Sequence, residues 1–414
     1  MKKFLALTLA LVMSLSLVAC GGQKTDDTNQ TDDTNQAEEP AADSEYKIAM
    51  ITDYGDITDQ SFNQTTYEAC KAFAEDNSIE FSYFRPAGDN TADRVAMIEK
   101  AVDEGFNVIV MPGYAFGGAI VEAAPEFPDV KFIALDVAAG DLLETAVAKA
   151  GEAYDYTPEN WDLNKYVDMS NVYCAVYQEE LCGYMAGYAA VKLGYKNLGF
   201  LGGMSVPAVV RYGYGFVQGV DAAAADLGLT DVKLNYIYGG QFFGDADITA
   251  VMDTWYQGGT EVVFACGGGI YTSAVDAAKK VGAKVIGVDV DQAGVIANYA
   301  GVDGMTVTSA MKGLYPATYD TLTDVIVNGN WDKYVGKIET LGLVSGTDPE
   351  ANYVQIPMGD GTQWSDSFTQ DDYKAMVKDM FDGKITVSNN TSSDVTAASF
   401  ATVITVDDQG SIKG

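Results

Sequence analysis

The chain has 414 residues, and 48% of them are hydrophobic. A chain of this length is longer than one compact core usually accommodates, so we expect two lobes. Its 59 acidic residues outnumber the 25 basic ones and give a formal net charge of −34, which argues against nucleic acid as a partner. The sequence contains no histidine, the commonest proton shuttle at neutral pH and the commonest zinc ligand, so an enzyme or a metal site is the weaker expectation.

Residues 1–19 have the pattern of a secretory signal peptide. Lys2 and Lys3 precede an apolar stretch that is too short to span a bilayer comfortably, and small residues follow it. The residues "LVAC", which end at Cys20, resemble the bacterial lipobox, whose cysteine is lipid-modified and becomes the first residue after cleavage. The alternative is an ordinary signal peptide with a chance cysteine. We expect a lipid anchor at Cys20 and a location on the extracytoplasmic face of the cell membrane.

Residues 20–45 form the expected tether behind this anchor. The segment is acidic, poor in apolar residues and repeats TDDTNQ, so it cannot bury enough surface to fold. As a flexible coil, about 25 residues hold a folded part about 25–30 Å from the lipid.

From residue 46 onward, short apolar runs alternate with helical patterns. The first series predicts strands and helices in turn at 47–52, 64–77, 79–84, 91–105, 107–113, 117–128 and 130–137. A second series repeats this order at 197–203, 213–228, 233–240, 248–259, 260–269, 271–282 and 283–291. Two such series predict an α/β fold with two doubly wound parallel sheets, whose ligands bind beyond the carboxyl ends of the strands.

Between the two series, residues 175–194 read as a helix with small residues at 183, 186, 187 and 190, which favours close helix packing over a membrane span. Residues 140–170 have weak periodicity and read as an insertion. We expect a first lobe of residues 46–172 plus about 291–325. We expect a second lobe, including the tail, of residues 173–290 plus about 326–414.

Four cysteines follow Cys20, at positions 70, 174, 182 and 266. An even number permits disulfides in an exported protein, but the spacing matches no compact disulfide framework and the surroundings are apolar. We therefore expect buried free thiols. No metal-ligand spacing is present.

Six separated segments resemble the basic membrane protein family of lipoproteins, which includes the bacterial purine nucleoside receptor. They are "ITDYGDITDQSFNQTTYE", "VYQEELCGYMAGYAA", "GFLGGMSVPAVVRYGYGFVQGV", "FACGGGIYTSAVDAAKK", "VIGVDVDQ" and "VTSAMKGLY", in family order. The resemblance implies a type I periplasmic-binding-protein fold with two hinged lobes. It implies a binding protein of an ABC importer, without cofactor or catalysis, that delivers purine nucleosides to a permease and its ATPase.

Three alternatives stay open at this point. The same fold binds sugars or autoinducer-like ligands in other proteins, and a surface lipoprotein can sense a ligand without transport. A nucleoside hydrolase is the enzyme alternative, with Asp53, Asp56 and Asp59 as bases or calcium ligands, but the missing histidines and the absent nucleophile motif argue against it.

The loop after the first strand carries Asp53, Phe62 and Asn63. An aromatic residue in so polar a loop either packs into its own lobe as a helix staple or forms a platform for a ligand. The resemblance favours the platform and assigns ligand contacts to all three residues.

The corresponding loop of the second series, "YGGQFFGD", offers Phe242 and Phe243 for the other face of a stacked base. Strand alternation lets only one of them point into the sheet. Similarity to the family favours Phe242 as the ligand contact.

Asp136 and Asp289 end matching strands of the two series, where an aspartate is often a helix N-cap. The resemblance assigns Asp136 to the edge of the base, where a carboxylate selects N–H donors, and Asp289 to the sugar hydroxyls.

Lys312 occupies the family's lysine position beside Asp289, the alternative being a surface lysine. Gly268 lies in a run of three glycines that allows close backbone approach and, taken alone, would suit a phosphate. Because acids flank the site and no Walker lysine follows, a neutral nucleoside is expected. Glu179, Glu180 and Arg211 are expected to form salt bridges across the cleft, between the lobes or with the transporter.

Overall fold

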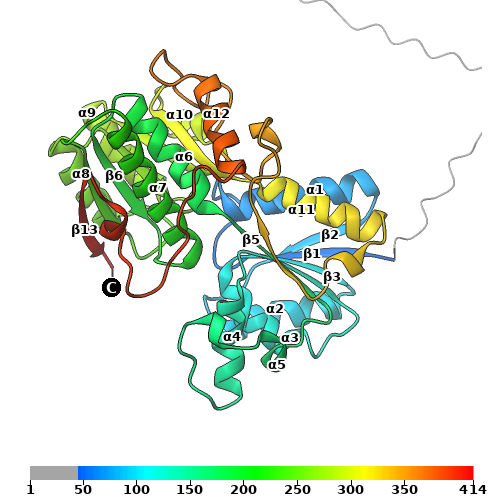
Figure 1. The fold of residues 1–414 in the computed structure, drawn as a ribbon. Coiled ribbons are helices and arrows are strands. Elements are labelled where there is room, and N and C mark those ends of the chain that lie inside the picture. The colour runs from blue at the N-terminus through cyan, green and yellow to red at the C-terminus, as the bar shows by residue number, and fades with distance from the viewer. Residues whose placement is uncertain (1–44, 414) are drawn as a thin grey trace, which may run out of the picture. The chain divides into compact units, whose positions relative to one another are not determined.

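The computed structural model describes residues 45–413 (Figure 1). The predicted signal peptide, the predicted lipid anchor at Cys20 and nearly all of the expected tether lie outside the described residues. Within residues 45–413, no helix is both long enough and apolar enough to cross a membrane.

The first lobe is built on a six-stranded parallel sheet. Its strand order is β11-β5-β4-β3-β1-β2. The strands are β1 (Lys47–Ile51), β2 (Glu80–Phe84), β3 (Val108–Pro112), β4 (Lys131–Leu135), β5 (Val172–Tyr177) and β11 (Ile338–Leu341). The helices are α1 (Phe62–Asn77), α2 (Thr91–Asp103), α3 (Gly117–Ala123), α4 (Ala139–Lys149), α5 (Leu163–Tyr166) and α11 (Leu314–Leu322).

Alternation along the buried strands gives this sheet a core on each face. In β1, Ile48 and Met50 belong to the core that includes Phe73 of α1, whereas Ala49 and Ile51 belong to the core on the α2 and α3 side. Figure 1 shows α1 and α11 on one side of the strands and α2 and α3 on the other.

The second lobe is built on a seven-stranded sheet with the order β12-β10-β9-β8-β6-β7-β13, parallel except for β12. The strands are β6 (Asn197–Gly202), β7 (Lys233–Tyr238), β8 (Val262–Cys266), β9 (Lys284–Asp289), β10 (Thr306–Lys312), β12 (Val354–Gln355) and β13 (Thr405–Ser411). The helices are α6 (Glu179–Lys192), α7 (Pro207–Asp226), α8 (Ala246–Gln257), α9 (Tyr271–Val281), α10 (Ala293–Ala300) and α12 (Gln370–Phe381). The predicted pair of doubly wound sheets is confirmed.

The predicted lobe boundaries are wrong at the strands near the crossovers. Strand β10, which we expected in the first lobe, pairs with β9 in the second sheet, and only α11 after it packs against α1 of the first lobe. Strand β11, which we expected in the second lobe, pairs with β5 in the first sheet, so residues 172–177 also belong to the first lobe. The local pattern predicts a strand but not the sheet in which it finds hydrogen-bond partners.

Two further local predictions need correction. Residues 172–177 form strand β5, where we expected a helix from residue 175. The expected insertion at 140–170 is partly regular, because α4 covers residues 139–149 and buries Leu142 and Val147. All four described cysteines are buried free thiols, as predicted.

The chain passes between the two sheets three times, after β5, after β10 and between β11 and β12. Backbone hydrogen bonds tie these crossings together. The N–H of Gln178 donates to the carbonyl of Leu341 at 3.0 Å, and the N–H of Gly313 donates to the carbonyl of Tyr353 at 2.7 Å. The N–H of Tyr353 in turn donates to the carbonyl of Gly342 at 3.0 Å. The hinge is therefore a set of joined segments.

The tail, for which the sequence suggested no role, completes the second lobe. Helix α12 buries Tyr373 against the core, and β13 adds an edge strand next to β7. Asp221 of α7 accepts hydrogen bonds from the backbone N–H groups of Thr402, Val403 and Ile404, which fixes the chain just before β13.

Helices α6 and α7 pack so closely that their backbones touch. A Cβ atom added at Gly219 would overlap the carbonyl of Tyr184, and the same overlap with the facing helix arises at Gly183, Gly187 and Gly215. The small residues predicted to allow close helix packing therefore do so.

We expect Gly219→Ala to lower the free energy of unfolding by about 1–3 kcal/mol, because the helices must separate to admit the methyl group. Gly294→Ala is the matched control, since Gly294 lies exposed in α10 with no neighbour within 4 Å of an added Cβ. That control should be neutral or stabilising by up to about 1 kcal/mol. Urea unfolding measures both, and equal stability of Gly219→Ala and the natural chain would contradict the close packing.

Candidate functional site

A cavity of about 460 Å³ is lined by residues of both lobes. All eight residues predicted to contact a ligand line it: Asp53, Phe62, Asn63, Asp136, Phe242, Gly268, Asp289 and Lys312. The first four come from the carboxyl ends of first-lobe strands and the loops after them, and the other four from the equivalent places in the second lobe. The structure therefore brings the predicted residues together, while their roles in binding stay predictions.

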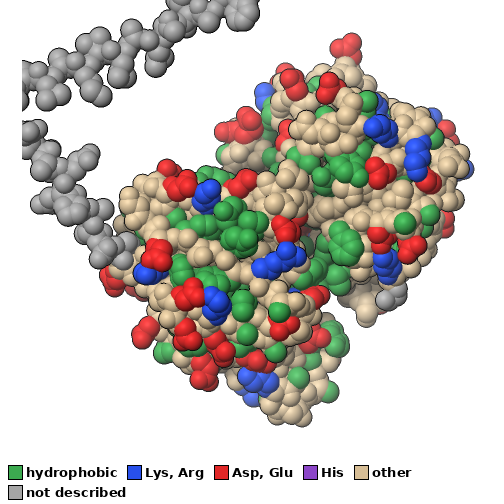
Figure 2. Space-filling model, turned by 180° about the vertical axis from the view of Figure 1, so that it is seen from behind, with side chains coloured by type: hydrophobic (Ala, Val, Ile, Leu, Met, Phe, Trp, Pro, Cys, Tyr) green, Lys and Arg blue, Asp and Glu red, His purple; other side chains and the backbone are tan. Residues whose placement is uncertain are grey.

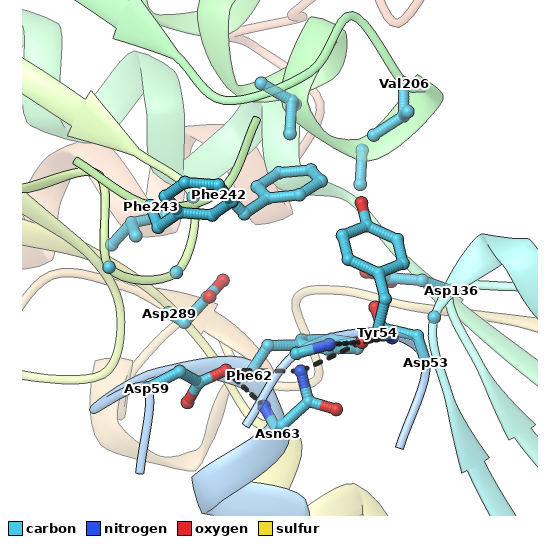
Figure 3. Close-up of a pocket in the computed structure, with 18 of the residues that line it drawn as sticks. Asp53, Tyr54, Asp59, Phe62, Asn63, Asp136, Val206, Phe242, Phe243 and Asp289 are labelled. Atoms are coloured by element: carbon cyan, nitrogen blue, oxygen red, sulfur yellow. Dashed lines mark hydrogen bonds between the residues drawn. The ribbon is translucent and has the colours of Figure 1, made fainter. Parts of the chain in front are cut away.

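Two phenylalanines lie on opposite sides of this cavity. Phe62 is the first residue of α1, and Phe242 lies in the loop after β7 (Figure 3). Both rings are partly buried and pack against the core while lining the cavity, so the position of Phe62 is compatible with both explanations, and its role as a ligand platform stays a prediction. The Phe242 ring rests against Gly203 and Gly267, where an added Cβ would overlap it.

Two more aromatic residues line the cavity. Phe243, the neighbour of Phe242, is 61% exposed and does not enter the core. Tyr54, which sequence reasoning missed, places its ring 6.0 Å from that of Phe242 and donates its hydroxyl to the sulfur of Met204 at 3.2 Å. The sequence did offer a signal for Tyr54 as a cavity residue, because Tyr54 directly follows Asp53 in the loop after β1.

The amide of Asn63 has a fixed orientation. Its Nδ2 donates to Asp53 Oδ1 and to Asp59 Oδ2, both at 3.2 Å (Figure 3). Because both partners only accept, the Asn63 Oδ1 atom must face the other way, and it is buried without a hydrogen-bond partner. Asn63 Oδ1 is thus a buried acceptor without a donor.

Asp53 and Asp59 are themselves held by the backbone. Asp53 accepts from the N–H groups of Tyr54 and Gly55, both at 2.6 Å. Asp59 accepts from the N–H groups of residues 61, 63 and 64 at the start of α1. Burial raises the pKa of Asp53, and burial raises the pKa of Asp59 to about 6 against the lowering effect of those N–H groups.

The ammonium of Lys312 is the centre of the charged part of the site. Lys312 ends β10 and is 5% exposed. Its Nζ lies 2.5 Å from Asp136 of the first lobe, 3.4 Å from Glu179 and 4.0 Å from Asp289 of the second lobe. Burial alone would lower the pKa of Lys312, but the three carboxylates together raise it. Lys312 is therefore not a surface lysine.

Arg211 is the second cation of this cluster. Its Nε donates to Glu179 at 2.6 Å, and this pair joins α7 to α6 within the second lobe. We expected Arg211 and Glu179 to form salt bridges across the cleft, between the lobes or with the transporter. That expectation is wrong, because the two residues pair with each other inside one lobe. In the cluster, the pair between lobes is Lys312 with Asp136.

Asp289 does not cap a helix, because the N-cap of α10 is Gln292. Its carboxylate instead accepts from the hydroxyl of Ser61 at 2.5 Å and from that of Tyr212 at 3.2 Å. Ser61 belongs to the first lobe, so this carboxylate is a contact between the lobes as well as part of the cavity wall.

Asp136 and Asp289 share an unusual backbone. Their φ angles are 59° and 65°, in the left-handed region that residues other than glycine rarely occupy. They lie at equivalent strand ends of the two lobes, and one oxygen of Asp136 is buried without a hydrogen-bond partner. Strained residues of this kind cluster at functional sites, which supports a role for both carboxylates.

The glycines after β8 support the aromatic loop. Gly267 and Gly268 have φ angles of 135° and 49°, and a Cβ at Gly268 would lie 2.9 Å from the carbonyl of Phe242. The N–H of Gly269 donates to that carbonyl at 2.8 Å. In the described structure this run therefore holds the Phe242 loop.

Carboxylates outnumber cations around Lys312. Burial, opposed by Lys312 and assisted by Glu179, raises the pKa of Asp136 to about 6. Burial also raises the pKa of Asp141, which accepts from the N–H of Ala138, to about 7. Burial and then Glu179 raise the pKa of Glu180 to about 7. Among residues 45–413, no group of histidine, cysteine and acidic residues could hold a metal ion.

These raised values predict a pH dependence of stability. A carboxyl with a raised pKa keeps its proton in the folded state when the unfolded chain has released it. Its contribution to the free energy of unfolding is therefore lost as pH rises through the folded-state pKa values of about 6 to 7. We expect the melting temperature to fall between pH 5.5 and pH 8, as measured by calorimetry.

Glu180→Gln should raise stability at pH 8 and flatten this slope, whereas Glu126→Gln at an exposed position should not. A melting temperature that rises over the same pH range would contradict the assignment.

The sequence model of a family described as "ABC transporter substrate-binding protein PnrA-like" matches residues 46–347. The nucleoside-binding protein BmpA of an ABC transporter in Lactococcus lactis is 25% identical over 358 residues, which cover 83% of this chain and 89% of that protein. Basic membrane protein B of Borreliella burgdorferi is 26% identical over 322 residues, covering 75% and 83%.

Solved structures share the fold. A solute-binding protein of an ABC transporter system from Aeropyrum pernix superimposes with a TM-score of 0.63 at 18% identity, covering 84% of this chain and 95% of that one. A second such protein, from Conexibacter woesei, gives a TM-score of 0.57 at 20% identity, covering 83% and 99%. The type I periplasmic-binding-protein fold is thereby confirmed. The chain belongs to the Bmp family of ABC transporter substrate-binding proteins, a family of binding proteins rather than enzymes.

Proposed function

We propose that this protein binds purine nucleosides, such as guanosine, inosine or adenosine, between its lobes and delivers them to an ABC permease with its ATPase. The observation that carries the proposal is the pair of phenylalanine rings, Phe62 and Phe242, on opposite sides of one cavity (Figure 3). A flat heterocycle is the ligand part that two such rings favour by stacking, at about 1–3 kcal/mol per base.

The cavity also suits a nucleoside in size. Its volume of about 460 Å³ falls within the range of about 300–1,000 Å³ that is usual for small-molecule sites. Aromatic and aliphatic side chains form much of the wall, and a few polar groups converge on it, which is the usual composition of such a site.

The unused acceptors favour a base with N–H donors. Asn63 Oδ1 and Asp136 Oδ1 are buried without hydrogen-bond partners, and both residues belong to the lining of the cavity. A base such as guanine or hypoxanthine brings ring N–H groups that would satisfy them, whereas leaving buried acceptors unpaired costs about 1–3 kcal/mol each. Lys312 as donor and Asp289 as acceptor suit the hydroxyls of a ribose.

The charge of the site favours a nucleoside over a nucleotide. Asp53, Asp136 and Asp289 line the same cavity, and Lys312 is already paired with carboxylates. An added phosphate would meet this excess of negative charge at short range.

Closure of the lobes around the ligand is the proposed mechanism. The hydroxyl of Ser61 donates to Asp289, and the amide of Gln292 donates to the carbonyl of Gln60 at 3.1 Å, so a first-lobe loop contacts the second lobe at the edge of the cavity. Such contacts exist only when the lobes approach, and a ligand that touches both lobes shifts the population toward that state. The permease would then recognise the closed form.

The proposed location is the extracytoplasmic face of the cell membrane, with a lipid on Cys20 as anchor. Relatives in Pyrococcus bear the name lipoprotein, which supports this part. Acidic, basic and hydrophobic side chains are mixed on the face shown in Figure 2, and the excess of 59 acidic over 25 basic residues in the chain suits neither a nucleic acid nor direct binding to anionic headgroups.

Isothermal titration of the lipid-free protein tests the ligand class. We expect heat of binding with guanosine and inosine, and a smaller effect with uridine or ribose, because these offer less ring surface for stacking. A protein purified free of ligand is needed. Heat with simple sugars but with no nucleoside would replace the proposal by a sugar-binding function, and incubation with inosine that releases hypoxanthine would indicate a hydrolase.

Phe62→Ala should weaken nucleoside binding by about 5-fold to 150-fold, which corresponds to about 1–3 kcal/mol for one stacked base. Phe381→Ala is the control, because Phe381 lies on α12 and is 49% exposed outside the cavity. The same titration measures both, and an unchanged affinity of Phe62→Ala would show that the ring serves only to pack its own lobe.

A further inference from the structure

The loop that carries Phe242 and Phe243 is contacted by a segment far away in the sequence. The loop runs from 239 to 244, and the segment follows β13, beyond the residues 46–347 that define the family match. We call residues 239–244 the aromatic loop. Nothing in the sequence connected the tail with the cavity.

Several contacts bring the tail to this loop. Strand β13 runs parallel to β7, and the indole N–H of Trp255 donates to Gln409 at 3.2 Å. At the end of the strand, the N–H of Ile412 donates to the carbonyl of Tyr238 at 2.8 Å, directly before the aromatic loop begins. The pairing of β13 with β7 therefore places the next residue, Lys413, beside the loop.

Lys413 is paired with Gln241 inside the aromatic loop and with Asp245, the residue directly after it. Its ammonium donates to Gln241 Oε1 at 2.9 Å and forms an ion pair with Asp245, the N-cap of α8. The amide of Gln241 in turn donates to Asp245 Oδ2 and to the carbonyl of Phe243, both at 2.9 Å. Lys413, Gln241 and Asp245 thus contact one another in a closed ring, and Gln241 links this ring to the backbone of Phe243.

The backbone of the loop leaves little room for another arrangement. Gly240 has a φ of 79°, and an added Cβ would lie 2.7 Å from the Cβ and carbonyl oxygen of Lys413. Phe242 is also held on the other side of the loop. Its ring lies against Gly203 and Gly267, and its carbonyl accepts a hydrogen bond from the N–H of Gly269. The angle of the Phe242 ring thus depends on what fixes residues 240–245.

We propose that Lys413 is a positioning residue for the binding site, which holds the aromatic loop so that Phe242 presents its ring to the cavity. The proposal rests on the proposed function for its readout in affinity. The ion pair is partly exposed, with side-chain exposures of 35% and 27%, so its effect is modest.

The test compares three variants of the full mature chain by titration with guanosine and with inosine. Lys413→Met, which keeps the length of the side chain without its charge, should raise Kd about threefold to fivefold, and Lys413→Arg should restore most of the loss. Lys280→Met is the matched control, because Lys280 is 53% exposed and pairs with Asp253 at 2.7 Å in the same lobe, away from the loop.

A double-mutant cycle separates positioning from general stability. In a Phe242→Ala background, Lys413→Met should have no further effect on Kd, because the ring that it positions is gone. Amide hydrogen exchange supplies a readout without ligand, and exchange in residues 239–245 should rise in Lys413→Met but not in Lys280→Met.

The outcomes are distinguishable. Suppose that the natural chain binds and that Lys413→Met has the same Kd and the same hydrogen exchange in the loop. This result would overturn the inference and leave the proposed function standing. If the natural chain binds neither nucleoside, the proposed function fails, and the loop exchange alone then decides whether Lys413 orders the loop. An equal loss of affinity in Lys280→Met would also overturn it, since the effect would then belong to the lobe as a whole.

Discussion

The site depends on one buried ammonium that neutralises carboxylates from both lobes. Lys312 lies within 4.0 Å of Asp136, Glu179 and Asp289, and Arg211 supplies the second cation through Glu179. Without Lys312, the buried Asp136 would lose its ion pair beside Glu179 and Asp289, and breaking a buried pair in this way typically costs about 3–5 kcal/mol. The position of Lys312 follows from the fold, because β10 ends where the chain leaves the second sheet for the first lobe. The same residue thus links charge balance, hinge and cavity.

The two lobes contribute matching parts to the cavity. Each supplies an aspartate with a left-handed backbone at the end of an equivalent strand, Asp136 in one and Asp289 in the other, and each supplies a phenylalanine from a loop. The supports differ, however. Phe62 begins a long helix whose first turn is fixed by Asp59, whereas Phe242 lies in a short loop that depends on neighbouring glycines and on the tail. The second ring is therefore the one whose position depends on residues far away in the sequence.

The strand and helix order could be predicted because buried strands such as β8 are continuous apolar runs and the helices carry a clear period. Strand β5 was missed because its apolar run leads through Gln178 almost directly into the apolar helix α6, without a turn signal between them. Strand β13 was missed because its sequence, TVDDQGS, is polar and lies exposed at a sheet edge. The eight site residues came from the family motifs, but the contacts of Tyr54 and Lys413 join segments that no local pattern relates.

The three hydrogen-bonded crossings have a mechanical consequence. Separate linkers would let one lobe twist or slide relative to the other, whereas a twist or a slide of these joined crossings would break the hydrogen bonds between them. The proposed closure would then proceed mainly as bending about the crossings. Such a motion would bring the rings of Phe62 and Phe242 toward each other along a defined path.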